Sequence, residues 1–384
     1  MTMLLGQVIF WSLFVAVVYV YVGYPLAVFL LARVHRRQVR TGPCEPTVSI
    51  LIAAYNEEAC IACTIENKLA LDYPREKLEV IVVSDGSTDR TEEIVRAYTK
   101  QGVKLLRQAP RYGKTAALNQ AMSRAAGEVL VFSDANSMYE PDALRYLVEN
   151  FHDPRVGYVT GKLIYVTPQG TTIGDGCSAY MKYENFIRVQ ETHLGSIVGV
   201  DGGIDAIRRS LYRTMKSDQI PDFVLPLRVA EQGYRVVYEP RAILREEANT
   251  TSEGEYRMRV RVSLRSLWAL KEMRRLLNVT RYGLFSWQLL SHKVLRYQAF
   301  ALLVLMYLIN AALWMSGPLY QLLFILQTLA YALCYVGYQL DRRGRPSAYL
   351  TFPYYFALIN VAAGHAFFKF LSGRKLVIWT PRAG

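Results

Sequence analysis

Glycine-rich nucleotide-binding loops do not follow the strand-like runs of this 384-residue sequence. A dinucleotide-binding turn requires Gly-x-Gly-x-x-Gly, whereas the first strand-like run leads into Ala54-Tyr55-Asn56-Glu57, which contains no glycine. A P-loop requires a further glycine ahead of Gly-Lys-Ser/Thr, but Gln108 occupies that position before Gly113-Lys114-Thr115. The sequence therefore disfavours both a dehydrogenase and a P-loop ATPase.

Charge is scarce relative to the apolar content of the chain. Charged residues make up 20% and hydrophobic residues 52% of the sequence, yet Lys and Arg exceed Asp and Glu by 45 − 32 = 13. A disordered chain would contain too few apolar residues to fold, so that class is excluded. The combination predicts separate apolar and basic blocks, as in a membrane protein with a basic cytosolic face.

Two long stretches lack charged residues altogether, at 7–32 and 297–340. The first is long enough to cross a hydrocarbon core of about 30 Å. Because no basic region precedes it, we predict a retained anchor and not a signal peptide. The second divides at Ser316-Gly317-Pro318 into two predicted spans. A third uncharged stretch, 346–368, contains Pro353 and is interpreted as interfacial or re-entrant.

Basic residues gather next to these stretches. The cluster between Arg33 and Arg40 follows the first span, so the positive-inside rule places the following domain in the cytosol of a multi-pass protein of the cell (inner) membrane. Between Arg257 and Arg281 there are eight Lys or Arg and one acid, Glu272, with apolar residues at helical spacing. This pattern predicts an amphipathic helix on an anionic lipid bilayer. No stacking or groove-reading motif accompanies the charge, so nucleic-acid binding is not expected.

Cysteine is rare, with five residues in the chain. Cys60 and Cys63 form a single C-x-x-C pair without the second pair that would complete a zinc site. We interpret them as small buried thiols on a helix. Because the surrounding domain is expected in the cytosol, no disulfides are expected.

The region 42–252 alternates between two kinds of segment. Strand-like runs at 48–53, 78–83, 103–107 and 129–132 alternate with helical patterns at 57–71, 88–99, 114–126 and after Pro141. This rhythm predicts a Rossmann-like α/β fold whose parallel sheet is covered on both faces. Ligands of such sheets bind at the carboxyl ends of the strands, where loops 55–57, 84–89 and 133–136 carry carboxylates.

Asp85 and Asp134 end two of these strands. Their carboxylates suit hydrogen bonds to a base or ribose, and they also suit a divalent cation that bridges a diphosphate. A turn or helix cap is the alternative role for Asp85, because Asp-Gly-Ser-Thr-Asp is also good capping sequence.

Four motifs in this order carry a resemblance to a known family: Ala54-Tyr55-Asn56-Glu57, Asp85-Gly86-Ser87-Thr88-Asp89, Gly113-Lys114 with Ala117-Leu118-Asn119, and Asp134-Ala135-Asn136. The chain resembles the family 2 glycosyltransferases, which have a GT-A fold. Its hydrophobic segments are similar to those of the membrane branch that includes cellulose, hyaluronan and poly-N-acetylglucosamine synthases.

The resemblance implies roles for particular residues. Asp222 would be the general base and Arg261 would face the diphosphate, as catalytic residues. Asp134 and Asn136 would bind Mg²⁺ or Mn²⁺, although Asn136 replaces the usual aspartate. The remaining roles are nucleotide binding by Tyr55, Glu57, Asp85, Lys114, Asp134, Arg259, Trp379 and Arg382, and acceptor binding by Asp201, Gly202 and Trp268.

Departures from the family pattern leave the length of the product open. Met258 and Val262 replace the glutamine and tryptophan of the motif that surrounds Arg261, which puts processive synthesis in doubt. The resemblance implies an inverting transfer from a UDP-sugar to a polysaccharide or lipid-linked acceptor, with homo-oligomer formation or an export partner for translocation. Single-sugar transfer to a lipid, as by ceramide glucosyltransferase, and a catalytically silent sugar-nucleotide-binding component are the alternatives.

The sequence then divides into five segments. They are an N-terminal transmembrane anchor (1–41), a GT-A domain (42–252), amphipathic interfacial helices (253–296), two transmembrane helices (297–340), and an interfacial or re-entrant helix with a tail that resembles the gating loop of the synthases (341–384).

Overall fold

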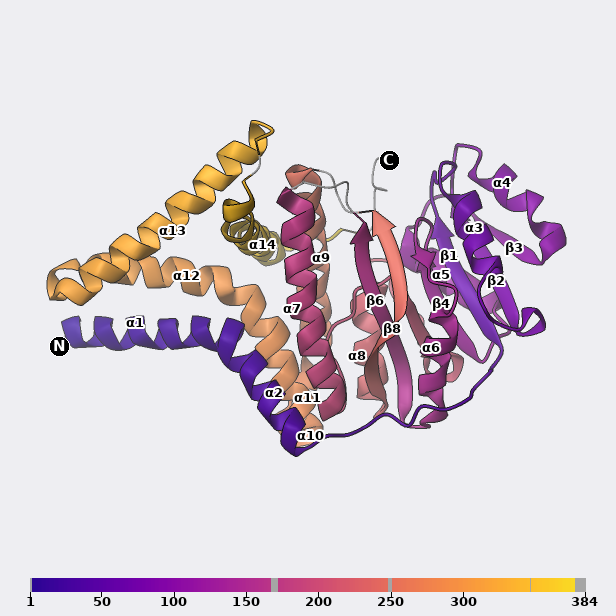
Figure 1. Cartoon of the computed structure of the whole chain (residues 1–384), viewed down its shortest axis with the longest axis horizontal. Coiled ribbons are helices and arrows are strands. Elements are labelled where there is room, and N and C mark those ends of the chain that lie inside the picture. The colour runs from indigo at the N-terminus through magenta and orange to yellow at the C-terminus, as the bar shows by residue number, and fades with distance from the viewer. Residues whose placement is uncertain (1, 167–171, 248–250, 346, 377–384) are drawn as a thin grey trace.

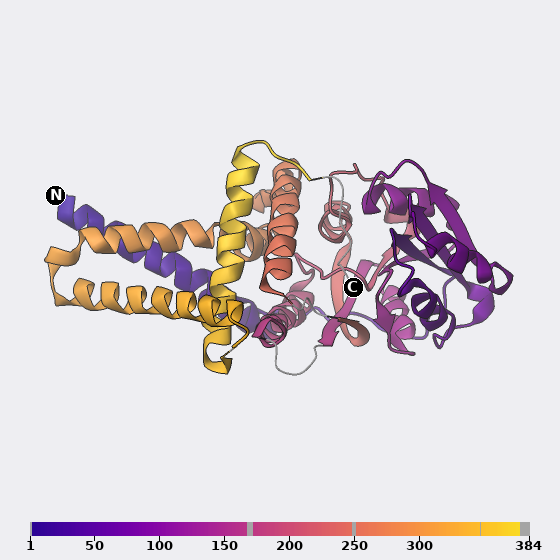
Figure 2. The same cartoon turned by 90° about the horizontal axis from the view of Figure 1, so that it is seen from above.

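The molecule is elongated, with an α/β domain at one end and long helices at the other (Figures 1 and 2). The computed structural model describes residues 2–166, 172–247, 251–345 and 347–376. Trp379 and Arg382, for which the sequence predicts nucleotide binding, lie outside the described residues.

One eight-stranded sheet forms the centre of the α/β domain, with the strand order β3-β2-β1-β4-β7-β6-β8-β5. The strands are β1 (Val48–Ala54), β2 (Leu78–Asp85), β3 (Val103–Gln108), β4 (Val129–Asp134), β5 (Met138–Tyr139), β6 (Val156–Val166), β7 (Asp205–Arg208) and β8 (Arg235–Glu247). The four predicted strands are confirmed as β1 to β4, which are mutually parallel. The other half is mixed, because β7 runs antiparallel to both β4 and β6.

Helices cover both faces of the sheet, as the strand–helix rhythm predicts. The helices of this domain are α3 (Ile61–Leu69), α4 (Thr91–Ala97), α5 (Lys114–Arg124), α6 (Ala143–Glu149) and α8 (Pro221–Glu231). Successive residues of β1 point to opposite faces, so Ile50 and Ile52 pack with α3, α4 and α6, while Leu51 and Ala53 pack with α5 and α8. The fully buried β1 therefore separates two apolar layers.

A second layer of helices stands beside the sheet (Figure 1). It contains α7 (Thr172–Leu194), α9 (Ser252–Glu272), α10 (Val279–Tyr282) and α14 (Ala348–Leu371). Val260 and Leu264 of α9 pack on Ala362 and Ala366 of α14. The small alanines allow the two helices to approach closely, which fixes α9 against the domain.

Among the described residues, three helical stretches are long and apolar enough to cross a membrane: Met3–Val34, Leu284–Ala312 and Pro318–Arg342. The first comprises α1 (Thr2–Val18), a π-helical turn (Tyr19–Gly23) and α2 (Tyr24–Val34). The second comprises α11 (Leu284–Leu289), a π-helical turn (Leu290–Val294) and α12 (Leu295–Ala312), and the third is α13 (Pro318–Arg342). Helix α14 crosses their direction (Figure 2), and the interfacial interpretation of 346–368 stays a prediction.

The structure differs from the sequence expectations in three places. The second long helix begins at Leu284 and not at 297, because Lys293 and Arg296, which precede the uncharged stretch, lie inside the helix. Helix α9 is not only an amphipathic surface helix, since Arg265 within it is buried. Cys63 is exposed and Cys60 is partly buried, so the prediction of two buried thiols is wrong for Cys63; all five cysteines are free.

Candidate functional site

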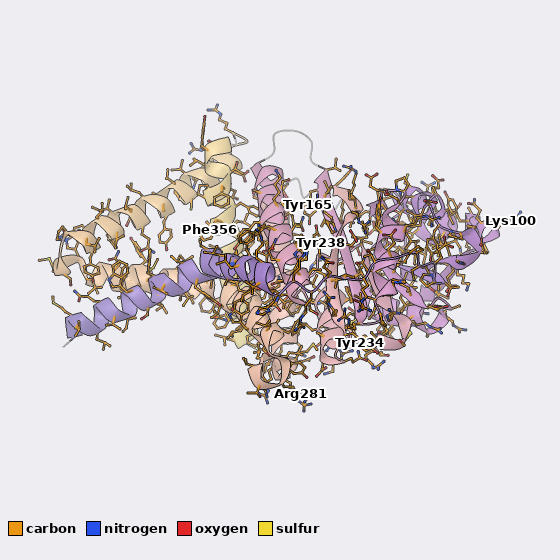
Figure 3. All side chains as sticks on the ribbon, turned by 60° about the horizontal axis from the view of Figure 1, so that its bottom comes forward. Lys100, Tyr165, Tyr234, Tyr238, Arg281 and Phe356 are labelled. Atoms are coloured by element: carbon orange, nitrogen blue, oxygen red, sulfur yellow. The ribbon has the colours of Figure 1, made fainter. Side chains whose placement is uncertain are left out.

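A cavity of about 330 Å³ lies where the carboxyl ends of β1 and β4 meet the helices α7, α8 and α9. Figure 3 places Tyr165, which lines it from β6, in the middle of the molecule between the strands and the second layer of helices. The predicted site residues that line this cavity are Glu57, Lys114, Asp134, Asn136, Asp201, Gly202, Asp222, Arg259 and Arg261. The structure therefore brings together residues as far apart in the sequence as Glu57 and Arg261.

Lys114 and Asp134 form an ion pair at the strand end of the cavity, with the Lys114 ammonium against Asp134 Oδ1. Burial disfavours the charge of Lys114, but attraction to Asp134 and Asp222 outweighs it and raises the pKa of Lys114. The lysine is thus a fixed positive charge. Helix α5 begins at this residue, directly after Gly113, whose φ of 91° is accessible to glycine at little cost.

Helix α3 holds the loop that carries Asp134 and Asn136. Thr64 Oγ1 donates to the Ala135 carbonyl at 2.5 Å, and Lys68 Nζ donates to the Ser137 carbonyl at 2.5 Å. Lys68 is buried, and its ammonium lies 3.7 Å from the centre of the Tyr139 ring. These hydrogen bonds hold the loop against α3, and the side chains of Asp134 and Asn136 line the cavity.

Asp222 occupies the first turn of α8, after Pro221. A carboxylate is favoured at this helix position by the amide groups of the first turn. Burial is the largest influence on Asp222 and raises its pKa, and Asp134 raises it further, whereas Lys114, Arg265 and Arg261 oppose the rise. A carboxylate with a raised pKa beside fixed cations is the environment expected of a general base.

Gly202 contacts the Asp222 carboxylate directly. Its φ is +82°, and a Cβ atom at this position would lie 2.7 Å from Asp222 Oδ2, well inside van der Waals contact. The glycine therefore leaves room for the carboxylate to face the cavity. The acceptor-binding role of Gly202 and of its neighbour Asp201 stays a prediction.

We predict that Gly202→Ala lowers the turnover number by on the order of tenfold, because displacing a reacting group by a fraction of an ångström is enough to slow a reaction by this amount. Gly233→Ala is the matched control, since Gly233 has a similar φ of +85° but no atom within 4 Å of an added Cβ. Turnover of both purified variants is compared with the unmodified protein. Equal loss in the two variants would mean that backbone strain, and not Asp222, is responsible.

Arginines of α9 line the cavity opposite Lys114. The family motif predicts Arg261, and Arg259, which pairs with Glu255 at 2.8 Å, lies two residues earlier. Sequence reasoning missed Arg265, which is buried and lies near Asp222. Burial lowers the pKa of Arg265 to about 10, so its guanidinium remains charged at neutral pH. The spacing of 261 and 265 on one helical face was the signal that could have found it.

Three predicted residues do not line the cavity within the part of the chain that the structure describes. The Asp85 carboxylate is buried and accepts hydrogen bonds from the backbone of Tyr112 and Gly113 at 2.8 and 2.9 Å. The Tyr55 ring stacks on Arg111, with 3.4 Å between the guanidinium carbon and the ring centre. Asp85 thus acts here on the loop that precedes Lys114, and its binding to a nucleotide stays a prediction, as does that of Tyr55.

Trp268 is the third of these residues. Its ring packs on Phe370 of α14, with 4.8 Å between the ring centres, and its indole N–H donates to the Arg374 carbonyl at 2.9 Å. The residue therefore lies against the start of the C-terminal tail. The structure gives it no contact with the cavity, and its predicted acceptor role stays untested.

The carboxylates of the cavity suit a divalent cation only in part. No group of three or more His, Cys, Asp and Glu able to hold a metal occurs among the residues that the structure describes. Asp134 and Asn136 nevertheless offer two oxygen ligands on one loop of the cavity wall. Mg²⁺ is commonly held by one or two carboxylates with substrate phosphates and water, so the two residues fit such a cation bound together with a diphosphate.

Comparison with known proteins defines the class. Residues 49–215 match the family described as Glycosyl transferase family 2, in agreement with the motifs, and the α/β domain that contains them has the GT-A architecture.

Among curated relatives, poly-beta-1,6-N-acetyl-D-glucosamine synthase of Staphylococcus aureus is 30% identical over 221 residues, which are 56% of this chain and 53% of the relative. A probable glycosyltransferase of Bacillus subtilis, YdaM, is 31% identical over 231 residues, which are 56% of this chain and 54% of that protein. The chain thus spans about half the length of the curated relatives it matches.

A solved structure extends the likeness in fold to almost the whole chain. The mannosyltransferase PcManGT of Pyrobaculum calidifontis, in complex with GDP-Man and Mn²⁺, matches with a TM-score of 0.70 at 24% identity, over 94% of this chain and 99% of that one. At this identity the match concerns the fold, including the arrangement of the long helices.

Proposed function

We propose that this chain is a membrane-bound inverting glycosyltransferase that transfers a sugar from a UDP-sugar to a polysaccharide or lipid-linked acceptor at the cytosolic face of the membrane. One observation carries the proposal: Asp222, the Lys114–Asp134 pair and Arg261 face one cavity at the carboxyl ends of parallel strands. The curated relatives named as synthases of an N-acetylglucosamine polymer support this class of activity.

Asp222 would act as the general base. An acceptor hydroxyl attacks the anomeric carbon, and its proton passes to the Asp222 carboxylate as the new carbon–oxygen bond forms. The bond to the diphosphate oxygen breaks on the opposite side of the same carbon, and the electron pair leaves with UDP. A single displacement of this kind inverts the anomeric configuration.

Fixed cations would stabilise the departing diphosphate. Lys114 and Arg265 are both enclosed and charged, and Arg261 lies in the same cavity wall. Positive charges held in place cost little reorganisation when negative charge develops. Asp134 and Asn136 would hold Mg²⁺ or Mn²⁺, which supplies further neutralisation of the diphosphate when bound. Nucleotide binding by Trp379 and Arg382, which lie outside the described residues, stays part of the proposal.

The three apolar helical stretches would anchor the chain in the bilayer, with the α/β domain in the cytosol next to the basic residues between Arg33 and Arg40. Three spans, counted within the described part of the chain, are few for a translocation channel. If the product is a polymer, export would require a second copy of the chain or a partner protein. If a single sugar is transferred to a lipid, no channel is needed.

Release of UDP tests the proposal. The full-length chain, purified in neutral detergent, is incubated with a panel of UDP-sugars, a lipid and glycan extract that supplies acceptor hydroxyls, and either Mg²⁺ or Mn²⁺, and free UDP is measured. We expect one UDP-sugar to be consumed well above the others. UDP release that equals the protein-free background for every donor would mean that the chain is a catalytically silent binding component.

The dependence of kcat/KM on pH at acid pH gives a further prediction. Because burial raises the pKa of Asp222 and the base must be deprotonated to accept a proton, kcat/KM is expected to rise with pH through that raised pKa. Below it the carboxyl is protonated and the rate falls tenfold per pH unit. The measurement is UDP release at saturating metal between about pH 4 and pH 9. A flat profile down to the pKa of an ordinary aspartate would contradict the assignment.

A further inference from the structure

The cavity continues past Asp222 into the second layer of helices. Its far end is lined by Tyr21, Arg188, Lys293 and Arg296. Tyr21, Lys293 and Arg296 belong to two of the apolar stretches that would cross the membrane. Charged residues in such stretches are costly, and they usually mark a functional path.

Lys293 contacts the loop that leads from the far end of the cavity to Asp222, the proposed general base. A Cβ atom at Gly199 would lie 2.5 Å from the Lys293 ammonium, so the lysine rests on the backbone of that glycine. Gly199 begins the loop that ends at Gly202, which contacts Asp222. An acceptor that reaches Asp222 through this end of the cavity therefore passes Lys293.

The cations at this end differ in how closely a carboxylate approaches them. Arg188, whose side chain is 3% exposed, forms a two-pronged ion pair with Asp201. Glu184 forms a close pair with Arg296, whereas Lys293 lies 3.8 Å from the same carboxylate. Burial disfavours the charge of Glu184, but Arg296 and His292 outweigh it and lower its pKa well below the usual value. One ionised carboxylate thus faces both Arg296 and Lys293.

One buried donor at this end lacks an acceptor within the part of the chain that the structure describes: Arg188 Nε has no hydrogen-bond partner. The Lys293 ammonium, which lines the same cavity, is partly exposed and has an ion-pair contact at 3.8 Å. A buried donor without an acceptor is expensive, and an anionic ligand with several oxygens would satisfy Arg188 Nε and pair with Lys293. The other carboxylate nearby, Glu191, is already bonded to His292 at 2.8 Å.

We propose that the far end of the cavity binds the phosphate of a lipid-linked acceptor, with Lys293 and Arg188 as donors to the phosphate oxygens. The inference rests on the proposed transferase function and names its acceptor class. The phosphate lies where two membrane-spanning stretches meet the domain, so the lipid chain extends into the bilayer while the acceptor hydroxyl reaches Asp222. The Arg296 guanidinium, 5.3 Å from the Tyr180 ring centre and 5.2 Å from that of Tyr183, is held beside this path.

Binding of radiolabelled farnesyl phosphate to the purified full-length chain in neutral detergent tests the proposal. We expect saturable binding that excess UDP does not displace, because the two phosphates occupy different ends of the cavity. Unlabelled farnesyl phosphate should compete, whereas farnesol and inorganic phosphate should compete at least tenfold less well. Lys293→Met should weaken binding at least tenfold, and Lys293→Arg should retain most of it.

Lys182→Met is the matched control, since Lys182 is an exposed lysine of α7 outside the cavity lining, and it should bind as the unmodified chain does. Thermal unfolding of each variant shows that it is folded. Equal binding by Lys293→Met, equal competition by farnesol, or equal competition by inorganic phosphate would each overturn the proposal. UDP release, measured on the same samples, reports separately on the transferase function: UDP release without farnesyl phosphate binding refutes the acceptor class alone.

Discussion

Asp222→Asn is expected to reduce sugar transfer by roughly 10² to 10⁴-fold, the range that a positioned general base contributes. The amide has the shape of the carboxylate but cannot accept the proton of the attacking hydroxyl. The fixed cations Lys114 and Arg265 remain, so the affinity for the UDP-sugar should change little. The loss should therefore appear in kcat, with the dissociation constant of UDP within about twofold of the unmodified chain.

Glu231→Gln is the control for this variant. Glu231 ends the same helix, α8, and is exposed and outside the cavity, so the same loss of one negative charge should leave transfer unchanged. Progress of the reaction under single-turnover conditions separates chemistry from product release. Transfer by Asp222→Asn at the rate of Glu231→Gln would show that another group takes the proton.

Asp134→Ala has the second largest expected effect, a loss of at least about 10²-fold in kcat/KM, which corresponds to about 2.7 kcal/mol of lost transition-state stabilisation. The substitution removes the carboxylate that pairs with Lys114 and that we propose as a metal ligand. Without it, the diphosphate would lose the bound cation, and Lys114 would lose the group that orients it.

Metal dependence separates these two consequences. Chelation with EDTA should abolish transfer by the unmodified chain, and Mn²⁺ or Mg²⁺ should restore it, whereas Asp134→Ala should respond to neither treatment. Asn136→Asp should bind Mn²⁺ more tightly, because a second carboxylate adds charge to the site. Asp142→Ala, at the start of α6 and outside the cavity, serves as the control. Full activity in EDTA would exclude the metal role of Asp134 and Asn136.

Much of the strand end of the site could be predicted from the sequence. Strands β1, β2 and β4 are short apolar runs followed by acidic loops, and parallel strands bring such loops to one edge of a sheet. Glu57, Lys114 and Asp134 therefore meet in the cavity as expected. The role of Asp222 could be predicted only through the family motif, since Asp222 is far in the sequence from the residues of β1 to β4 that lie near it in the cavity.

The helix end of the site could not be predicted in the same way. Lys293 and Arg296 directly precede the uncharged stretch 297–340 and therefore look like the boundary of a span. In the structure they lie within the second long helix and pair with Glu184. That pairing depends on the packing of α7, for which no local pattern gives a signal. Asp85 and Trp268 show the converse, because their residue types suit binding while the tertiary structure gives them backbone partners.

The anomeric configuration of the product tests most directly whether Asp222 drives a single displacement in this cavity. The full-length chain would be given a UDP-α-sugar labelled with ¹³C at the anomeric carbon, together with the acceptor that supports UDP release, and the product would be examined by NMR. We predict a β-linked product from the unmodified chain and none above background from Asp222→Asn. An α-linked product, or a β-linked product formed equally well by the variant, would contradict a single displacement with Asp222 as its base.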